Sequence, residues 1–326
     1  MRSTIAAKLF ATALALCALA PFSARAADKI IVGAVSIGTA IQWPLWVMVD
    51  KGFAAEEDLT VDLVAIGSAN NVLQQAAAGS LNLAIPVAGD AFRAIDKGAQ
   101  ITVVRTDCEH VPHTLVVKPS IKTMTDLKGK VISIGALVGL DRIYLDNALA
   151  AAGLHSGEYD VIAAGSTSHR FSALMSGAVD AATIAAPLNF RAVGRGFNDL
   201  GSVELKDHHY PFSLYVAYTP WLQQHGPLVV RYLRAYAKAV NWLNDAKNKE
   251  EASAILAKWG RGRVEDARMT YDLFHKGQYF LPRGDMTPAD LDGFIDLLAK
   301  AGYIKGSHDP RRFFDSSYLA AAMKAR

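Results

Sequence analysis

Two stretches of the sequence, 98 positions apart, carry the polar residues best suited to binding a small molecule. They are GSANNVLQQAAAGSLNLAIP, from Gly67 to Pro86, and GSTSHRFSALMSGAVDAATI, from Gly165 to Ile184. Each has a serine suited to cap a helix (Ser68, Ser166), a glycine suited to end it, and then a short apolar strand. We therefore expect one helix–strand unit built twice, with a ligand held between the two polar helix starts.

The first turns of the two expected helices differ in charge. The first turn of one helix carries Asn70 and Asn71, whose amides would face a ligand or only cap the helix. The other helix has His169 and Arg170 at this position, and cations at a helix N-terminus oppose the helix dipole. That pair would contact an anionic ligand or the other lobe, or it is an ordinary solvated surface pair.

Further candidate ligand contacts follow other expected strands, because ligands in open α/β sheets bind beyond the carboxyl ends of the strands. Trp43 would contact the ligand or pack against a neighbouring loop. Asp90 opens a helix after a small-residue loop, and it would either contact the ligand or only cap that helix. Arg105 has a planar guanidinium that suits a carboxylate or sulfonate, or it pairs with Asp107. The remaining candidates of this kind are Ala88, Gly89, Gly139, Arg142, Pro187 and Asn189.

Several kinds of catalytic motif are absent from the sequence. It contains no G-x-S-x-G elbow, no phosphate-binding G-x-x-x-x-G-K-[ST] loop and no H-E-x-x-H motif. The two cysteines are Cys17 and Cys108, and no Cys/His spacing of a metal site occurs. The sequence favours binding and release over catalysis, and we expect no catalytic residue, no metal and no cofactor.

The N-terminus is typical of an export signal. Arg2 and Lys8 precede an apolar run, and Ala24–Ala26 is an A-x-A cleavage pattern. We expect residues 1–26 to be removed and the mature protein to be periplasmic. Removing the three basic residues of this segment leaves 31 basic and 31 acidic residues, so the mature chain has no basic field for nucleic acid.

The rest of the chain fits two lobes joined by two crossings. We expect residues 27–112 to form the first part of lobe 1, residues 113–210 to form lobe 2, and residues 211–326 to return to lobe 1 and add C-terminal helices. The run from His209 to Tyr218 is rich in aromatic and β-branched residues, which predicts a returning strand. The two crossings, near His113 and Ser213, would make a two-strand hinge.

Four segments carry a family resemblance: WPLWVMVDKGFAAEEDLTVDLV, AAAGSLNLAI, DLKGKVISI and ALMSGAVDAATIAAP. In this order they resemble the periplasmic substrate-binding proteins of ABC importers, in the nitrate/sulfonate/taurine-type branch. That branch shares its fold with the thiamine-pyrimidine synthase family. The resemblance implies an α/β fold of two lobes, a type II "Venus flytrap", with the ligand in the cleft and docking to a permease and ATPase complex.

The resemblance also places ligand contacts in the loops after the strands. In this chain those positions are Gln42 and Trp43, Ser68 to Asn71, Ala88 to Asp90, Gly139, and Ser166 to His169, which adds Gln42 and Ser168 to the candidates above.

We therefore expect a periplasmic protein that captures a small organic anion, a sulfonate or an aromatic or aliphatic carboxylate, and delivers it to an ABC importer. Two alternatives stay open. One is pyrimidine-precursor binding or a synthase-type enzyme of the same fold, although the cysteine-rich motif of the synthases has no counterpart here. The other is a ligand-sensing module for a membrane receptor.

Overall fold

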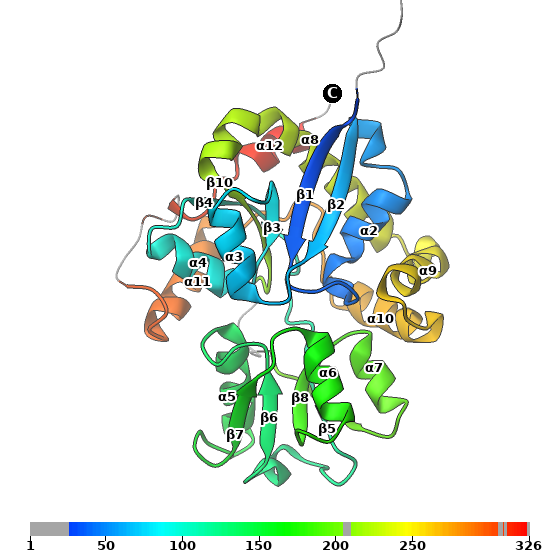
Figure 1. The fold of residues 1–326 in the computed structure, drawn as a ribbon, viewed down its shortest axis with the longest axis vertical. Coiled ribbons are helices and arrows are strands. Elements are labelled where there is room, and N and C mark those ends of the chain that lie inside the picture. Colours follow the sequence, from blue (N-terminus) through cyan, green and yellow to red (C-terminus); the bar gives the residue numbers. More distant parts are fainter. Residues whose placement is uncertain (1–25, 205–209, 306–308, 310–311, 325–326) are drawn as a thin grey trace, which may run out of the picture.

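The computed structural model describes residues 26–204, 210–305, 309 and 312–324. The expected leader, apart from Ala26, lies outside the described residues. The described chain forms two lobes, each built on one five-stranded sheet (Figure 1). The α/β architecture of two lobes predicted from the sequence is confirmed.

The sheet of lobe 1 has the strand order β2-β1-β3-β10-β4. Strand β1 runs parallel to β2 and β3, whereas β10 runs antiparallel to β3 and β4. The carboxyl ends of β1 to β4 therefore share the edge that faces lobe 2 (Figure 1). The strands are β1 (Asp28–Ala34), β2 (Leu59–Ala65), β3 (Leu83–Ile85), β4 (Ile101–Thr106) and β10 (Leu214–Tyr218).

The sheet of lobe 2 repeats this arrangement in the order β7-β6-β8-β5-β9. Strand β6 runs parallel to β7 and β8, and β5 runs antiparallel to β8 and β9. Because β5 is antiparallel, its first residue, His113, pairs with Ala185 at the carboxyl end of β8. The strands are β5 (His113–Val117), β6 (Val131–Ile134), β7 (Asp160–Ala163), β8 (Ala181–Ala185) and β9 (Asn198–Ser202).

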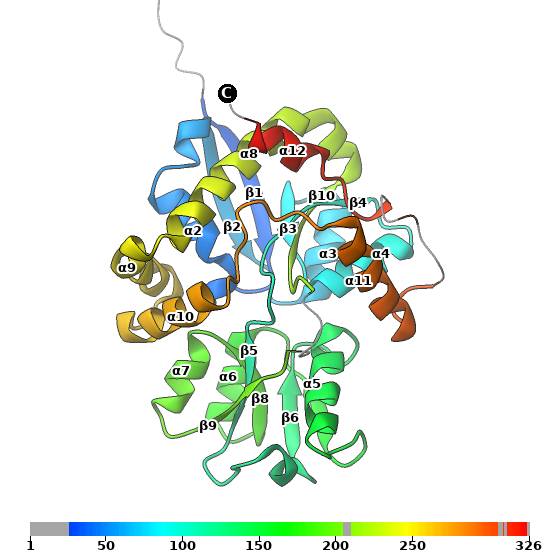
Figure 2. The same ribbon diagram turned by 180° about the vertical axis from the view of Figure 1, so that it is seen from behind.

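The helices cover the faces of the two sheets (Figures 1 and 2). Those of the sheet-forming halves are α2 (Trp43–Asp50), α3 (Ala69–Ala77), α4 (Ala88–Asp96), α5 (Leu140–Ala151), α6 (Thr167–Met175) and α7 (Leu188–Val193). The C-terminal helices are α8 (Thr219–Asn244), α9 (Lys249–Gly260), α10 (Val264–Lys276), α11 (Pro288–Lys300) and α12 (Ser317–Met323). Short 3-10 turns lie at Ala40–Gln42, Ala55–Glu57, Met124–Leu127 and Ala246–Asn248.

The predicted repeat is confirmed in its local structure. The side chain of Ser68 accepts a hydrogen bond from the Asn71 N–H at 3.2 Å, and that of Ser166 accepts one from the His169 N–H at 3.4 Å. The residues that precede β3 and β8 also correspond. The Asn82 side chain accepts a hydrogen bond from the Ile31 N–H in β1, and the Asp180 side chain accepts one from the Val131 N–H in β6.

The chain crosses between the sheets twice, after β4 and before β10, and the two crossings are hydrogen-bonded to each other. The Phe212 N–H donates to the Cys108 carbonyl oxygen at 2.7 Å, and the Asp107 N–H donates to that of Ser213 at 2.9 Å. The Ser213 hydroxyl donates to the Asp107 carboxylate at 2.9 Å. These hydrogen bonds join the two crossing segments into a single connection between the lobes.

The returning strand is shorter than predicted, because β10 begins at Leu214. His209 lies outside the described residues, and Tyr210 to Ser213 belong to the crossing. Pro211 has no N–H to donate to a strand ladder, and the N–H groups of Phe212 and Ser213 are directed to Cys108. The prediction of a strand over this part was therefore wrong.

Trp43 anchors the C-terminal helices to lobe 1. Its side chain is fully buried, and its indole N–H donates to the Ala252 carbonyl oxygen in α9 at 3.0 Å. The ring packs edge-on against Tyr271 of α10, with 5.9 Å between ring centroids. The buried ring of Trp43 therefore adds apolar packing between lobe 1 and the C-terminal helices, and its single N–H donor adds a directional hydrogen bond.

Replacing Trp43 by alanine should lower the free energy of unfolding by about 3 to 5 kcal/mol, because the change opens a cavity and leaves the Ala252 carbonyl without its donor. Urea unfolding monitored by circular dichroism measures this loss. The control is Trp221→Ala, since Trp221 is only partly buried and stacks on His225. Equal losses for the two variants would contradict the anchoring role of Trp43.

Candidate ligand-binding site

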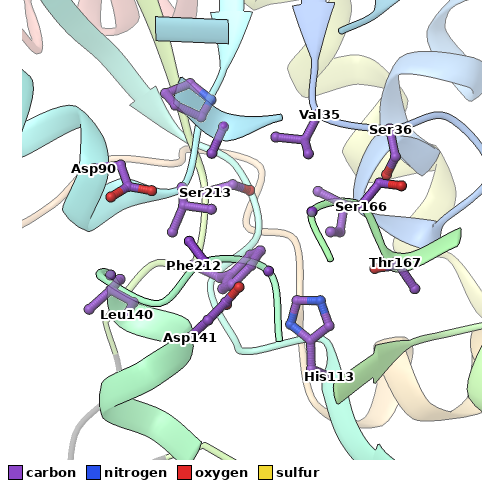
Figure 3. A pocket seen from close by; sticks show the side chains of 18 of the residues that line it. Val35, Ser36, Asp90, His113, Leu140, Asp141, Ser166, Thr167, Phe212 and Ser213 are labelled. Atoms are coloured by element: carbon purple, nitrogen blue, oxygen red, sulfur yellow. The ribbon is translucent and has the colours of Figure 1, made fainter. Parts of the chain in front are cut away.

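A cavity of about 70 Å³ lies between the two lobes, where the carboxyl edges of the sheets face each other (Figure 3). One water needs roughly 10 to 15 Å³ on this measure, so the space suits a small organic molecule or several waters. Both lobes and the second crossing contribute to its walls. Lobe 1 supplies Val35, Ser36, Ile41, Gln42, Ala69, Ile85, Pro86, Val87 and Asp90; lobe 2 supplies His113, Gly135, Ala136, Gly139, Leu140, Asp141, Gly165, Ser166, Thr167 and Arg170; Phe212 and Ser213 belong to the second crossing.

Four helices begin at this cavity. Ala69 and Leu140 are the first residues of α3 and α5, Val87 is the cap of α4, and Ser166 is the cap of α6. The positive ends of four helix dipoles therefore point at the enclosed space. This convergence follows from the fold, because each of these helices comes directly after a strand end at the shared edge.

Two carboxylates lie in the first turns of these helices. Asp90 is almost fully buried, and its carboxylate accepts a hydrogen bond from Arg93 at 2.8 Å. Burial raises the pKa of Asp90 from 3.8 to about 6, although the Arg93 charge opposes this rise. Burial also raises the pKa of Asp141, against the nearby Arg170 charge and a hydrogen bond from the Gly135 backbone.

Arg170 is the one cation among the described residues that line the cavity, and its bonds are mostly made within lobe 2. Its Nε donates to the Thr183 carbonyl oxygen at 2.7 Å and its Nη1 to that of Gly165 at 2.6 Å. Its Nη2 donates to the Thr167 hydroxyl at 3.0 Å and lies 2.8 Å from Nε2 of His113. Four of the five guanidinium N–H groups therefore have partners inside the protein.

The lobes also touch each other around the cavity. The Tyr303 hydroxyl, beyond α11, accepts a hydrogen bond from the Gly139 N–H and lies 2.9 Å from the Gly139 carbonyl oxygen. On the opposite side the Ala40 N–H donates to the Ala186 carbonyl oxygen at 3.0 Å, and Arg191 of α7 lies 3.7 Å from Asp266 of α10. The structure is thus a closed arrangement of the two lobes.

Close packing at this interface depends on two glycines. A Cβ on Gly89 would lie 2.9 Å from a Leu140 side-chain atom, which is an overlap across the interface. Gly139 has a φ of 150° and lies beside the Asp90 carboxylate. A larger residue at either position would push the lobes apart.

The sequence-predicted site residues fall into three groups. Gln42, Asp90, Gly139 and Ser166 line the cavity itself. Ser68, Asn70, Asn71, Ala88, Gly89, Ser168 and His169 lie beside lining residues in the first turns of α3, α4 and α6. The third group, which is Trp43, Arg105, Arg142, Pro187 and Asn189, does not line the cavity.

The polar residues of the third group have partners inside the protein. Arg105 is fully buried, donates to the carbonyl oxygens of Thr106 and Leu281, and stacks 4.4 Å from the Tyr236 ring centroid. Arg142 pairs with Asp146 one turn along α5 at 2.7 Å.

The partners of Asn189 lie in lobe 2, and its amide nitrogen is 3.4 Å from both Thr114 and Asp199. Pro187 is the N-cap residue of α7. None of the five residues of the third group lines the cavity, although the sequence predicted all five as ligand contacts.

Sequence reasoning missed His113, Asp141 and Phe212 as lining residues. His113 begins a strand, and only the antiparallel direction of β5 brings it to the carboxyl edge of the sheet. Asp141 could have been identified from the sequence, because it is an acid in the first turn of a helix that follows a glycine-containing loop. Phe212 lies in the crossing, where the sequence predicted a strand.

The fold and the site define a periplasmic-binding-protein architecture, and solved structures agree. The alkanesulfonate-binding protein SsuA of Xanthomonas axonopodis pv. citri, bound to MOPS, has a TM-score of 0.67 at 16% identity, covering 90% of this chain and 97% of that one. The nitrate-binding protein NrtA of Synechocystis PCC 6803 has a TM-score of 0.75 at 16% identity, covering 90% and 88%. A DszB variant in complex with biphenyl-2-sulfinic acid has a TM-score of 0.63 at 12% identity, covering 91% and 99%.

The chain belongs to the NMT1/THI5-like family, whose model matches residues 42–250. The predicted resemblance to the nitrate and sulfonate branch of periplasmic binding proteins is confirmed. A comparison with curated protein sequences gives no significant match.

No helix in the described part of the chain combines the length and apolar character needed to cross a bilayer. Nor do the described residues gather three or more His, Cys, Asp or Glu side chains where a metal ion could bind.

The raised pKa of Asp90 predicts how stability changes with pH. A folded-state pKa above the unfolded value favours the folded protein at acidic pH, and this contribution is lost as pH rises from about 4 through 6. The shift corresponds to about 3 kcal/mol. Asp90→Asn should therefore lose less stability than the parent chain between pH 4 and 7 in urea unfolding series. The exposed Asp62→Asn is the control, and parallel curves for Asp90→Asn and the parent would refute the prediction.

Proposed function

We propose that this protein is the solute-binding component of an ABC importer, which captures a small organic molecule between its lobes. The observation that carries the proposal is the cavity to which both lobes and a crossing contribute. A ligand in this space would contact α3 and α4 from one side and α5 and α6 from the other. Its binding free energy would therefore favour the closed arrangement over an open one.

Localisation and delivery belong to the same proposal. The N-terminal sequence has the pattern of an export signal. Two proteins of similar fold, SsuA of Escherichia coli and NrtA, are periplasmic proteins that bind aliphatic sulphonate and nitrate. A periplasmic protein of this fold that closes on a solute would present it to a membrane permease driven by an ATPase. A receptor in place of the permease is the alternative partner.

The small organic anion predicted from the sequence has support from the four helix N-termini at the cavity. Two of the cations behind that prediction, Arg105 and Arg142, are bound elsewhere in the fold. The side chains that line the cavity add two carboxylates and a single arginine. The helix N-termini of the site therefore favour a negatively charged ligand, whereas its two carboxylates favour a positively charged one.

An enzyme of the same fold is the second candidate that the sequence leaves open, and DszB is a structural neighbour. The cavity serine Ser213 donates to the Asp107 carboxylate and accepts from the Cys108 N–H, which ties its hydroxyl into the crossing. Cys108 is fully buried, and burial raises the pKa of its thiol well above the usual value. These contacts favour binding over nucleophilic catalysis.

Expression with the leader in a Gram-negative host tests the proposal. Native mass spectrometry of the periplasmic fraction should show a chain cleaved near Ala26 that retains a small cargo. After the cargo is removed, adding it back should shrink the radius of gyration in small-angle scattering. It should also stabilise the fold, by about 2.7 kcal/mol at a hundredfold excess over Kd. An uncleaved cytoplasmic protein, or a cargo that leaves the radius unchanged, would overturn the proposal.

Tyr303→Phe should weaken binding of that cargo, because it removes the hydroxyl that joins the C-terminal segment to Gly139 across the interface. The loss of about 0.5 to 1.5 kcal/mol corresponds to a roughly twofold to tenfold rise in Kd. Isothermal titration measures it, with Tyr318→Phe, in α12 and away from the interface, as the control. An unchanged Kd would show that this contact does not contribute to closure.

A further inference from the structure

The hydrogen-bonding state of His113 is set by its neighbour. Nη2 of Arg170 lies 2.8 Å from Nε2 of His113, and a guanidinium can only donate, so Nε2 accepts. Burial and the Arg170 charge lower the pKa of His113 well below its usual value, which keeps the ring neutral. The single ring proton is therefore on Nδ1, and the described residues offer this buried atom no partner. His113 thus presents an unused N–H donor at the cavity.

Asp141 and Asp90 provide the opposite kind of group. Asp141 enters from α5 of lobe 2, and Asp90 enters from α4 of lobe 1 (Figure 3). A Cβ on Gly135 would lie 2.1 Å from a carboxylate oxygen of Asp141, so the carboxylate is pressed against the loop backbone. Arg93 neutralises part of the charge of Asp90, but the one cation lining the described cavity, Arg170, has four of its five N–H groups engaged. Asp141 also accepts a hydrogen bond from the Gly135 backbone. A carboxylate has about four acceptor positions, so both groups keep acceptor capacity for a ligand beyond these contacts.

The wall also has an apolar part, beside the polar side chains of Ser36, Gln42, Ser166, Thr167 and Ser213. Ile41, Ile85 and Leu140 line the cavity, and Phe212 packs edge-on against His113 with 5.1 Å between ring centroids. An apolar body can lie against these side chains while a polar end meets the carboxylates.

We infer that the solute carries a protonated amine that donates hydrogen bonds to Asp141 and Asp90, an acceptor atom for Nδ1–H of His113, and a small apolar body. The inference rests on the proposed function and assigns the ligand a charge opposite to that of a simple anion. A carboxylate or sulfonate without a basic nitrogen would bring acceptors only, and would offer no donor to the remaining lone pairs of the two aspartates in a dehydrated space.

Matched small molecules on one carbon skeleton test this inference. Benzylamine, benzyl alcohol and benzoate, and in parallel butylamine, butanol and butyrate, are titrated against the cargo-free protein at pH 7.5 while its melting temperature is followed. The amine of each set should stabilise the protein at concentrations at least tenfold lower than the alcohol or the acid. A set in which the carboxylate is the better ligand, or in which the amine has no advantage, would overturn the inference.

Variants assign the effect to the carboxylates. Asp141→Asn should raise the amine concentration needed for a given shift at least tenfold. Asp146→Asn should leave it unchanged, since Asp146 lies on the same helix but pairs with Arg142 outside the cavity. Asp90→Asn provides the same test if Asp141→Asn does not fold. Equal amine binding by Asp90→Asn or Asp141→Asn and the parent chain would refute the assignment.

The retained cargo separates this inference from the proposed function. A cargo whose mass and fragmentation show a basic nitrogen supports both. A cargo that lacks basic nitrogen refutes the amine and leaves the solute-binding function standing.

Discussion

The hydrogen-bonded pair of chain crossings is the constraint on which the rest of the structure depends. Asp107 and Cys108 in one crossing are bonded to Phe212 and Ser213 in the other, and the second crossing also lines the cavity. Tyr236 of α8 donates a further hydrogen bond to Asp107, which connects this junction to the C-terminal helices. The two lobes are therefore joined through one junction, and Phe212 and Ser213 of this junction lie in the wall of the cavity between them.

The electrostatics of the cavity follow from the same topology. Strands that end at one edge place helix N-termini around the space. The acids in the first turns of α4 and α5 carry the charge that these dipoles stabilise. Burial raises the pKa of both acids because neither dipoles nor neighbouring arginines replace the lost water. The site is thus polar, and Nδ1 of His113 is buried there with no partner among the described residues.

The repeat, the two lobes and the C-terminal helices could be predicted from the sequence, because caps, glycine stops and apolar strands are local signals. Ser68 and Ser166 cap their helices as their positions suggest. The locations of Trp43 and Arg105 could not be predicted, because α9, α10 and the 281–284 segment come from distant sequence and cover these residues. Asn189 contacts Thr114 and Asp199, which the folding of lobe 2 brings to it from other strands. His113 was missed because strand direction, which is a property of the sheet, decides which end of β5 meets the cavity.

A crystal structure of the protein with the cargo it retains from the periplasm tests the account most directly. The account predicts electron density for one small molecule that contacts Asp90 or Val87 of lobe 1 and Asp141 or Ser166 of lobe 2 at once. Density bound to a single lobe, or located outside the space between the sheets, would contradict it.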